Sequence, residues 1–495
     1  MKKTKIVATI GPSSEDEDTL EDLIKNGVNV ARLNFSHNTH EYHARLIERI
    51  RKIEKKMKRP FAILQDLQGP RIRIGKLKEE IEVKKDAHVI FFPESEKRVE
   101  TSAGVYVPMQ HRDLSKDLKI GHRVLIEDGT IQFRVLGLKK SVAVCVAESS
   151  GVIRSHKGVN FPDSSLTTSV LTRKDIRDIQ FGVHKGVDFI ALSFVRGPRD
   201  ILRLRKYIYA FQKKNGVQQK FLGKPEGPGK WPGVHTRIIA KIERKEAVEN
   251  FDAILEASDG IMVARGDLGI EFPLERVPLI QKEIVQKCNR HGKPVIVATH
   301  MLDSMIKNPI PTRAEISDVA NAILDGADAI MLSGETASGK YPVKSVHVMA
   351  KVAHEVESAH FDGFRNHEVC SEKVHSITEA VSRSVQNIAK DARAALIICS
   401  TTSGFTARNI AKHKPSIPII PITPFDKTRR QLCLTWGVKS YPSPFISSIS
   451  KLIRESTKII LKHHLAKKGD KVVLCAGHPF GYMGETNLIR VYTIE

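Results

Sequence analysis

The residues best suited to chemistry in this sequence are a lysine and two carboxylates at the ends of two successive apolar runs. Lys241 and Glu243 stand two positions apart at the end of one run, which places both side chains on one face of a β-strand. Asp267 ends the next run. Two carboxylates that converge from adjacent strands suit a hard cation such as Mg²⁺ or Mn²⁺. A lysine beside them would neutralise an anion that the metal also bridges, which is what phosphoryl transfer requires.

Polar residues also end most of the other apolar runs in the first 340 or so residues. They are Arg32, Asn34, Ser36, His37, Asp66, Ser193, Arg265, Gly266, Thr299, His300, Ser333 and Glu335. Taken singly, each has a structural explanation: Lys241 and Glu243 could form an ion pair at the end of a strand, and Asp267 could cap a helix. Taken together, they indicate one polar site where the runs end.

Eight short apolar runs, rich in Val, Ile and Ala, alternate with amphipathic stretches such as 18–25 and 41–58. The runs are 6–11, 28–35, 61–67, 187–194, 236–243, 260–267, 294–301 and 329–335. Runs with little polar alternation are typical of strands buried on both faces of a parallel sheet. The pattern predicts an α/β protein built on a (β/α)₈ TIM barrel over residues 1–71 and 159–355. Its active site is expected at the carboxyl ends of the strands.

Two interruptions break the barrel pattern. The stretch between the third and fourth runs is far too long for one crossover, and its segments 124–126 and 131–135 indicate a hairpin. We therefore predict a small β-barrel domain over 72–158, inserted after the third strand as a lid. The Gly- and Pro-rich segment 213–234 should lie at the opposite end of the barrel, as an inert or partner-binding surface loop without a catalytic role.

The β–α pattern restarts after the barrel and predicts a separate α/β domain over 356–495. A helix is indicated by Val374, Ile377, Val381, Val385 and Ile388, and strands by 394–400, 417–423, 471–477 and 488–494. The segment Thr401-Thr402-Ser403-Gly404 ends the first of these strands and opens a helix. Backbone N–H groups and hydroxyls there could bind a phosphate or merely cap the helix.

Composition narrows the function classes. The chain of 495 residues has a formal net charge of +23, which suits anionic ligands. The basic residues are spread along the chain and aromatics make up only 6%, so we expect no nucleic-acid partner. No apolar run is long enough for a membrane span or a signal peptide. The six cysteines lie far apart without a CxxC pair, which indicates reduced thiols and a cytoplasmic protein.

Several long motifs resemble the pyruvate kinase family over nearly the full length of the chain. They lie at 4–14, 30–37, 155–160, 238–243, 258–269 and 308–337. The resemblance implies transfer of a phosphoryl group from phosphoenolpyruvate to ADP, which yields pyruvate and ATP. It also implies Mg²⁺ or Mn²⁺ as cofactor and a homotetramer.

The resemblance gives each site residue a role. Lys241 and Arg32 contact the phosphoryl group, and Glu243 and Asp267 hold the divalent metal. The backbone of the segment Ala264, Arg265, Gly266 and Asp267 cradles the substrate carboxylate together with Thr299. Thr299 also lies where the enolate is protonated, through water and Ser333. The nucleotide-side positions match Asn34, His37 and Arg73.

One departure from the family concerns K⁺. Most members bind K⁺ at the positions of Asn34, Ser36, Asp66 and the backbone carbonyl of Leu67, and carry a glutamate at position 71. Members with Leu and Lys at positions 67 and 71 resemble a K⁺-independent subgroup, in which the fixed cation replaces the ion. Leu67 and Arg71 fit that subgroup, so K⁺ should not be required. Arginine is bulkier and more weakly hydrated than lysine, so the replacement is not equivalent.

Other departures are smaller. The family has Gln at the position of His300 and Gly at that of Asn38, where Asn can keep a left-handed turn. His300 either adds a titratable group near the site or simply packs. In the C-terminal domain, the resemblance implies a sugar-phosphate or AMP effector at Thr401, Thr402, Ser403, Gly404 and Thr406. Phe405 replaces an often polar or basic neighbour, which leaves the effector's identity open and loss of regulation as an alternative.

Two other functions compete with the kinase. A metal-dependent carbon–carbon lyase on a similar barrel also works through a pyruvate enolate, but the long lid and the polar set after the second run argue against it. A catalytically silent scaffold or nucleic-acid protein would fit the net charge of +23. Such a protein would be expected to lose Lys241, Glu243 or Asp267, and all three are present.

Overall fold

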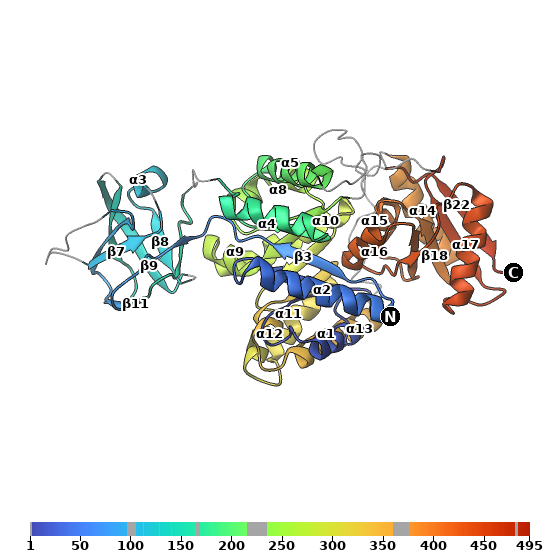
Figure 1. Ribbon diagram of the computed structural model, residues 1–495, viewed down its shortest axis with the longest axis horizontal. Coiled ribbons are helices and arrows are strands. Elements are labelled where there is room, and N and C mark those ends of the chain that lie inside the picture. Colours follow the sequence, from blue (N-terminus) through green and yellow to red (C-terminus); the bar gives the residue numbers. More distant parts are fainter. Residues whose placement is uncertain are drawn as a thin grey trace.

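Three bodies lie in a row along the molecule (Figure 1): a small β domain, a central barrel and a C-terminal α/β domain. The computed structural model describes most of the chain. The described residues are 2–96, 105–111, 113–127, 129–139, 141–164, 169–214, 235–359, 376–480 and 484–495.

The central body is a closed barrel of eight parallel strands in the order β1-β17-β16-β15-β14-β13-β3-β2, which confirms the predicted fold. The strands are β1 (Lys5–Thr9), β2 (Val30–Asn34), β3 (Ala62–Asp66), β13 (Phe189–Leu192), β14 (Arg237–Ile242), β15 (Gly260–Ala264), β16 (Val295–Ala298) and β17 (Ala329–Leu332). Each falls inside the run predicted for it or starts one residue earlier. The polar residues that end the runs therefore lie at one mouth of the barrel.

Helices surround the barrel between its strands. They are α1 (Glu17–Lys25), α2 (His40–Met57), α4 (Arg173–His184), α5 (Pro198–Lys214), α7 (Lys245–Glu249), α8 (Phe251–Ala257), α9 (Arg265–Glu271), α10 (Val277–Arg290), α11 (Arg313–Leu324), α12 (Gly334–Ala337) and α13 (Pro342–Ser358). Lys213 and Lys214, expected in a loop, instead complete α5, because the helical pattern continues to its basic last turn. The rest of the predicted loop, 215–234, lies outside the described residues.

The small domain has a seven-stranded sheet in the order β4-β12-β8-β9-β10-β6-β7, and an isolated bridge between Ile74 and Met109 joins its two ends. A separate antiparallel pair is formed by β5 and β11. Its elements are β4 (Ile72–Arg73), β5 (Ile81–Val83), β6 (His88–Pro93), β7 (Val105–Met109), α3 (Leu114–Asp117), β8 (Arg123–Ile126), β9 (Ile131–Lys139), β10 (Val142–Ala147), β11 (Gly151–Ile153) and β12 (Gly158–Asn160). The predicted hairpin is the antiparallel pair β8–β9. The sheet closes on its own apolar core, where Phe91 and Phe133 meet edge to face.

The C-terminal domain has a five-stranded sheet in the order β20-β19-β18-β21-β22. Its elements are α14 (Ile377–Asp391), β18 (Leu396–Ser400), α15 (Phe405–Ala411), β19 (Ile419–Thr423), α16 (Asp426–Gln431), the 3₁₀ turn η3 (Leu432–Leu434), β20 (Tyr441–Pro442), α17 (Ile449–Lys462), β21 (Lys471–Ala476) and β22 (Leu488–Thr493). The predicted helix is α14, and Val374, expected in it, lies outside the described residues.

Helix α16 and η3 dock this domain onto the barrel end opposite the site. Arg430 pairs with the buried carboxylate of Asp188, Nε to Oδ1, at 3.0 Å. The Gln431 side chain donates to the carbonyls of Asp188 and His235. Leu434, which is fully buried, belongs to the same apolar cluster as the side chains inside the barrel, such as Leu64. The C-terminal domain thus closes the bottom of the barrel.

Replacing Leu434 by Ala is expected to destabilise the protein by about 2 to 5 kcal/mol, the range for truncating a buried leucine. The reason is that a cavity would open where the barrel interior meets the C-terminal domain. Denaturant unfolding of both proteins measures the loss. Leu274→Ala is the control, because Leu274 is 75% exposed and should change stability little. Equal stability of the two variants would contradict the role of Leu434 in closing the bottom of the barrel.

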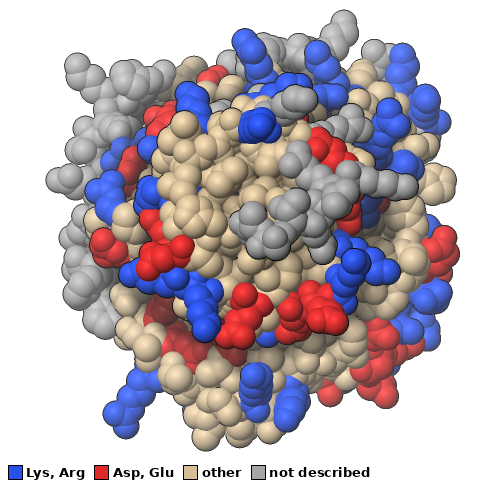
Figure 2. Space-filling model, turned by 90° about the vertical axis from the view of Figure 1, so that its left-hand side faces the viewer, with Lys and Arg blue, Asp and Glu red and all other residues tan. Residues whose placement is uncertain are grey.

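Basic side chains do not form one continuous positively charged surface. Figure 2 shows Lys and Arg side chains dispersed among Asp and Glu side chains on the end of the molecule that carries the small domain. Such mixing agrees with the view that most of the net charge is spread over the surface. None of the helices that the structure describes is both long and apolar enough to cross a membrane.

Candidate active site

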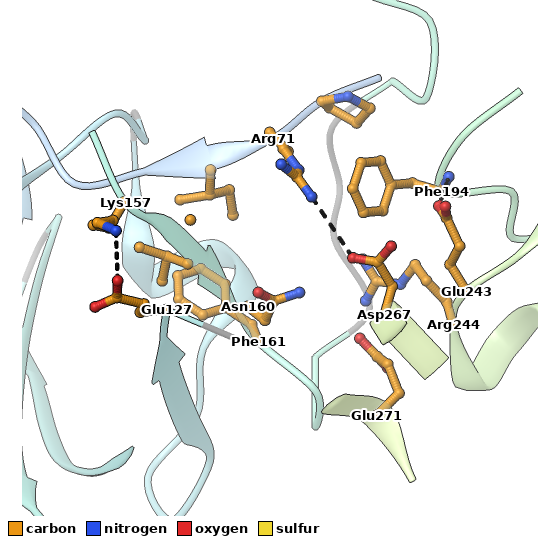
Figure 3. Close-up of a pocket in the computed structure, with 14 residues that line it drawn as sticks. Arg71, Glu127, Lys157, Asn160, Phe161, Phe194, Glu243, Arg244, Asp267 and Glu271 are labelled. Atoms are coloured by element: carbon orange, nitrogen blue, oxygen red, sulfur yellow. Dashed lines mark hydrogen bonds and ion pairs between the residues drawn. The ribbon is translucent and has the colours of Figure 1, made fainter. Parts of the chain in front are cut away.

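The polar ends of the barrel strands meet in a cavity of about 180 Å³ at the carboxyl mouth of the barrel. A second cleft of about 220 Å³ adjoins it and shares the side chains of Arg71, Phe194, Glu243 and Asp267. Figure 3 shows this cleft with Glu127 and Lys157 of the small domain facing Glu243, Asp267 and other barrel residues across it. The site therefore lies between the barrel and the inserted domain.

Lys241 is the centre of the charges in the cavity. Its Nζ lies 2.8 Å from Glu243 Oε1 and 3.4 Å from Asp66 Oδ1, and it donates to Ser193 Oγ at 2.8 Å. Burial by itself would lower the pKa of Lys241, but Asp66 and Glu243 raise it above its ordinary value. The ammonium group is therefore a fixed positive charge at the barrel mouth.

Glu243 and Asp267 face the same cavity from β14 and α9. Burial raises the pKa of Glu243, Lys241 opposes the shift, and the negative charge of Asp267 adds to it. Glu243 Oε2 accepts from the backbone N–H of Phe194 at 2.7 Å. Glu243 Oε1 is buried, and its near partner is the Lys241 ammonium group, 2.8 Å away. A buried carboxylate oxygen beside a second carboxylate is the setting that a divalent cation stabilises.

The fit to a divalent ion rests on these two carboxylates. Within the described ranges, no group of three or more His, Cys, Asp or Glu side chains is arranged to hold a metal. A cation bound by Glu243 and Asp267 would therefore need oxygen ligands from water or from a bound substrate. That donor set suits Mg²⁺ or Mn²⁺, which usually keep several such ligands.

Arg32, in the middle of β2, lines the same cavity. Its guanidinium makes two contacts with Asp66 Oδ2, through Nη2 at 2.6 Å and Nε at 2.7 Å, and donates to Thr9 Oγ1 at 2.9 Å. Burial opposes ionisation of Asp66, but Lys241 and Arg32 hold its pKa below the usual range. Asp66 thus orients two positively charged side chains, those of Lys241 and Arg32, toward the cavity.

Thr299 sits in a strained turn after β16. Both Thr299 (φ 70°) and His300 (φ 53°) adopt left-handed backbone conformations, which cost non-glycine residues free energy. The Arg265 guanidinium donates to the Thr299 carbonyl at 2.8 Å and pairs with Asp318 at 2.6 Å. The Gly266 N–H donates to Thr299 Oγ1 at 2.8 Å. The Arg265 side chain therefore braces this turn and does not line the cavity.

The residues expected on the nucleotide side lie near one another. Asn34, Ser36 and His37 line the same cavity as Lys241. Burial, Arg73, Arg71 and Arg32 together lower the pKa of His37, in that order of effect. Arg73 starts the small domain and donates to the His156 carbonyl at 2.8 Å. Asn38 has φ 65°, the left-handed conformation anticipated for it.

Four residues expected at the site line neither of the two cavities: Arg73, Arg265, Gly266 and Ser333. Ser333, at the end of β17, is half-buried, and its backbone N–H donates to Glu335 Oε2 at 2.7 Å. Thr299 and Met331 line the cavity from that side.

Three of the four oxygen positions expected for K⁺, those of Asn34, Asp66 and Leu67, are already bonded to groups of this chain. The Leu67 carbonyl accepts from Ser193 Oγ at 2.8 Å, and Asn34 Oδ1 accepts from the Ser36 N–H at 3.1 Å. Asp66 is paired with Arg32 and Lys241. Arg71 Nη2 lies 3.8 Å from Asp267 Oδ1, so its charge falls on the Asp267 side of the cavity.

The C-terminal turn is tied to the barrel. The Ser403 carbonyl accepts from Arg237 of β14 at 2.8 Å and from Arg408 at 3.1 Å. The Gly404 N–H donates to Thr401 Oγ1, and Gly404 has φ 81°. The Thr402 carbonyl accepts from Thr428 Oγ1, and Thr406 Oγ1 lies 3.0 Å from Thr486 Oγ1.

Sequence reasoning gave no role to three residues at the site. Ser193 ends β13, so its position was visible in the sequence, but its contact with Lys241 was not. Arg244 and Glu271 line the second cleft. Burial raises the pKa of Glu271 to about 7, against the effect of Arg244. Arg244 directly follows Glu243 in the chain, and this adjacency was the one feature of the sequence that could have pointed to Arg244 as a site residue.

Comparison with known proteins agrees with this geometry. The family model described as pyruvate kinase, barrel domain, matches residues 1–226 and 230–346, and that described as pyruvate kinase, alpha/beta domain, matches 379–492. A pyruvate kinase of Clostridium acetobutylicum is 41% identical over 497 residues, with all of both chains covered. One from Geobacillus stearothermophilus is 42% identical, and the match covers all of this chain and 81% of the length of that relative. The crystal structure of a pyruvate kinase from Cryptosporidium parvum superposes with a TM-score of 0.90 at 36% identity, over 100% of this chain and 96% of that one. The chain belongs to the pyruvate kinase family.

Proposed function

We propose that the protein transfers the phosphoryl group of phosphoenolpyruvate to ADP. The bond between phosphorus and the enol oxygen breaks, a bond from phosphorus to a terminal oxygen of ADP forms, and the enolate takes a proton at carbon to become pyruvate. The observation that carries the proposal is the position of Lys241 Nζ between Asp66 and Glu243, in a cavity that Asp267 and Arg32 also line.

Lys241 and Arg32 are the positive charges for the moving phosphoryl group. Catalysis of phosphoryl transfer depends on positioning and on charge stabilisation rather than on covalent chemistry. Asp66 holds both cations in place before substrate arrives, so little reorganisation is needed when negative charge develops on the phosphoryl oxygens.

Membership of the family implies a divalent metal ion, and we propose that Glu243 and Asp267 hold Mg²⁺ or Mn²⁺. When bound, this ion neutralises charge on the phosphate and on the enolate oxygen. Glu243 is preset for the task, because its burial and its closeness to Asp267 already disfavour two bare carboxylates.

The residues around the proposed metal position take the remaining roles. The backbone of Ala264, Arg265, Gly266 and Asp267 cradles the substrate carboxylate with Thr299 and directs it toward the metal. Thr299, with Ser333 and water, supplies the proton to the enolate. Asn34, His37 and Arg73 bind ADP. These assignments are supported by the shared cavity of Asn34, His37, Ala264, Asp267 and Thr299.

We assign three working units to the chain: a catalytic barrel over 1–71 and 159–355, a lid over 72–158, and a C-terminal domain over 356–495. Closure of the lid over the second cleft would exclude water, which otherwise hydrolyses the phosphoryl donor. In support, Glu127 and Lys157 of the lid form an ion pair at 2.5 Å that lines this cleft.

Activity without K⁺ is expected, because Leu67 and Arg71 match the K⁺-independent subgroup and groups of this chain already bond to three of the four oxygens at the K⁺ positions. The rate in sodium or tetramethylammonium buffer should equal that in potassium buffer. Steady-state assays in the three salts at equal ionic strength measure this, and a rate that collapses without K⁺ contradicts it. Arg71→Glu, which removes the fixed cation, should create a K⁺ requirement.

Regulation, assembly and location complete the proposal. A sugar phosphate or AMP binds at Thr401, Thr402, Ser403, Gly404 and Thr406, a turn linked to β14 through Arg237.

The protein is a cytoplasmic homotetramer. In support, Leu274, Leu279 and Ile310 of the barrel domain are large exposed apolar side chains, and β22 is an edge strand.

A coupled assay tests the function directly. The protein is mixed with phosphoenolpyruvate, ADP and Mg²⁺, and pyruvate and ATP are each measured. Equal amounts of the two products are expected. Pyruvate with inorganic phosphate but without ATP would indicate hydrolysis of the donor, and neither product would indicate the lyase or a catalytically silent protein.

A further inference from the structure

The loop after β2 carries Asn34, Ser36 and His37, and its backbone is held from outside the barrel. Lys174 Nζ, on α4, donates to the Phe35 carbonyl at 2.6 Å. His43 Nε2, on α2, donates to the His37 carbonyl at 3.0 Å. The His43 ring also stacks on Phe35, with centroids 4.0 Å apart. Two helices thus grip both ends of this short loop.

Lys174 is itself held in place. Its Nζ pairs with Asp178 Oδ2 one turn further along α4, at 2.6 Å. The Asp178 side chain is only 3% exposed, and its other oxygen accepts from His40 Nε2 at 2.7 Å. The Asp178 carbonyl accepts from the Gln65 side chain of β3 at 2.7 Å. The lysine therefore reaches the loop from a rigid base.

The same turn of α4 holds the point where the chain enters the lid. Asp175 Oδ1 accepts from the Gly69 N–H at 3.2 Å, and Asp175 Oδ2 accepts from Thr172 in a capping box. Gly69 has φ 69°, and a Cβ there would lie 2.8 Å from the Phe194 ring, so the backbone has little freedom. The group Lys174, Asp175 and Asp178, the α4 bracket, therefore connects the loop after β2 to the lid entry.

We propose that Lys174 is a positioning residue that sets the ADP side of the site through the Phe35 carbonyl. The inference rests on the proposed function and adds a residue to it. Lys174 lies behind the loop and does not line either cavity. It acts through the loop, between the side chains of Asn34 and Ser36.

The effect is selective because of where the other site residues come from. Lys241 and Glu243 arise from the end of β14, and Asp267 from α9. In the part of the chain that the structure describes, none of them forms a hydrogen bond or ion pair with the α4 bracket. Loss of the Lys174 contact frees only the loop after β2. The affinity for ADP should fall, while the affinity for phosphoenolpyruvate should stay as it was.

Two variants and one control test the proposal in the full-length protein. Lys174→Met removes the charge and the donor, and should raise the KM for ADP by about tenfold, the size of effect for one hydrogen bond to a charged group. The KM for phosphoenolpyruvate and kcat at saturating ADP should not change. Lys174→Arg keeps a charged donor and should restore most of the ADP affinity.

Lys185→Met is the matched control. Lys185 lies at the other end of α4 and also contacts α2, where its Nζ is 2.9 Å from Glu48 Oε1. This pair lies away from the loop, so both KM values should match those of the unmodified protein. Thermal unfolding of all three variants shows whether any effect comes from loss of the fold.

Each other outcome has a definite meaning. An unchanged KM for ADP in Lys174→Met, or an equal rise in both KM values with a lower unfolding temperature, would overturn the positioning role while leaving the proposed function intact. Absence of pyruvate and ATP formation in the unmodified protein and in Lys185→Met would instead overturn the proposed function.

Discussion

Replacing Lys241 by Met is expected to lower kcat by at least about 10³-fold, the upper range for loss of one donor to a developing negative charge. Methionine keeps the length and packing of the side chain but carries no charge. Arg32 would remain on Asp66, so that carboxylate keeps a partner. The fold should therefore persist, and circular dichroism together with thermal unfolding checks that it does.

The control for this variant is Lys245→Met. Lys245 lies four residues further along the chain, its side chain is 59% exposed, and its partner Glu249 is also exposed. Its replacement should leave kcat unchanged. Turnover by Lys241→Met close to that of the unmodified protein would contradict a role for the ammonium group in phosphoryl transfer.

The barrel was predictable because its strands are buried on both faces. Such strands read as continuous apolar runs, and the polar residues that end them mark the carboxyl mouth. The observed strands are shorter than the predicted runs, because residues at one or both ends of each run lie outside the strand. At the end of β14, for example, Glu243 already turns into the cavity and bonds to Phe194.

The membership of the site was partly predictable. Lys241, Glu243 and Asp267 could be brought together from the spacing of their residues and the order of their strands. The brace formed by Arg265 and Asp318 could not, because it joins residues far apart in the chain through one side-chain orientation. The strain at Thr299 also escaped prediction, since Thr is not a residue that favours positive φ.

Contacts between elements far apart in the chain were the least predictable part. Leu434 looks like any buried leucine of the C-terminal domain, yet it completes the core inside the barrel. Lys174 follows a helix cap and reads as an exposed basic residue, yet it bonds to a carbonyl of the loop after β2. Periodicity reports the burial of a residue within its own element, but it does not report which other element the residue contacts.

Replacing Glu243 by Gln is the second prediction with a large expected effect. The amide has nearly the same shape but no charge, so the divalent ion would lose one of its two carboxylate ligands. The concentration of Mg²⁺ or Mn²⁺ needed for half-maximal activity should rise by about 10- to 100-fold or more, at least the loss seen when a supporting group of a metal site is removed. Titration calorimetry with Mn²⁺ measures the same change without turnover.

The control is Glu249→Gln, because Glu249 is 61% exposed and lies away from the cavity. Its metal activation should match that of the unmodified protein. An unchanged Mn²⁺ affinity in Glu243→Gln would contradict the role of Glu243 as a ligand.

The two variants separate the two charges of the site. Lys241→Met keeps both carboxylates and loses a neighbouring positive charge, so it should still bind Mn²⁺ while turnover stays low at every metal concentration. Glu243→Gln keeps the ammonium group, so its turnover should recover as metal is added. The opposite pattern, with metal rescuing Lys241→Met but not Glu243→Gln, would mean that Glu243 serves mainly to hold Lys241 Nζ, 2.8 Å away, and that the cation binds elsewhere.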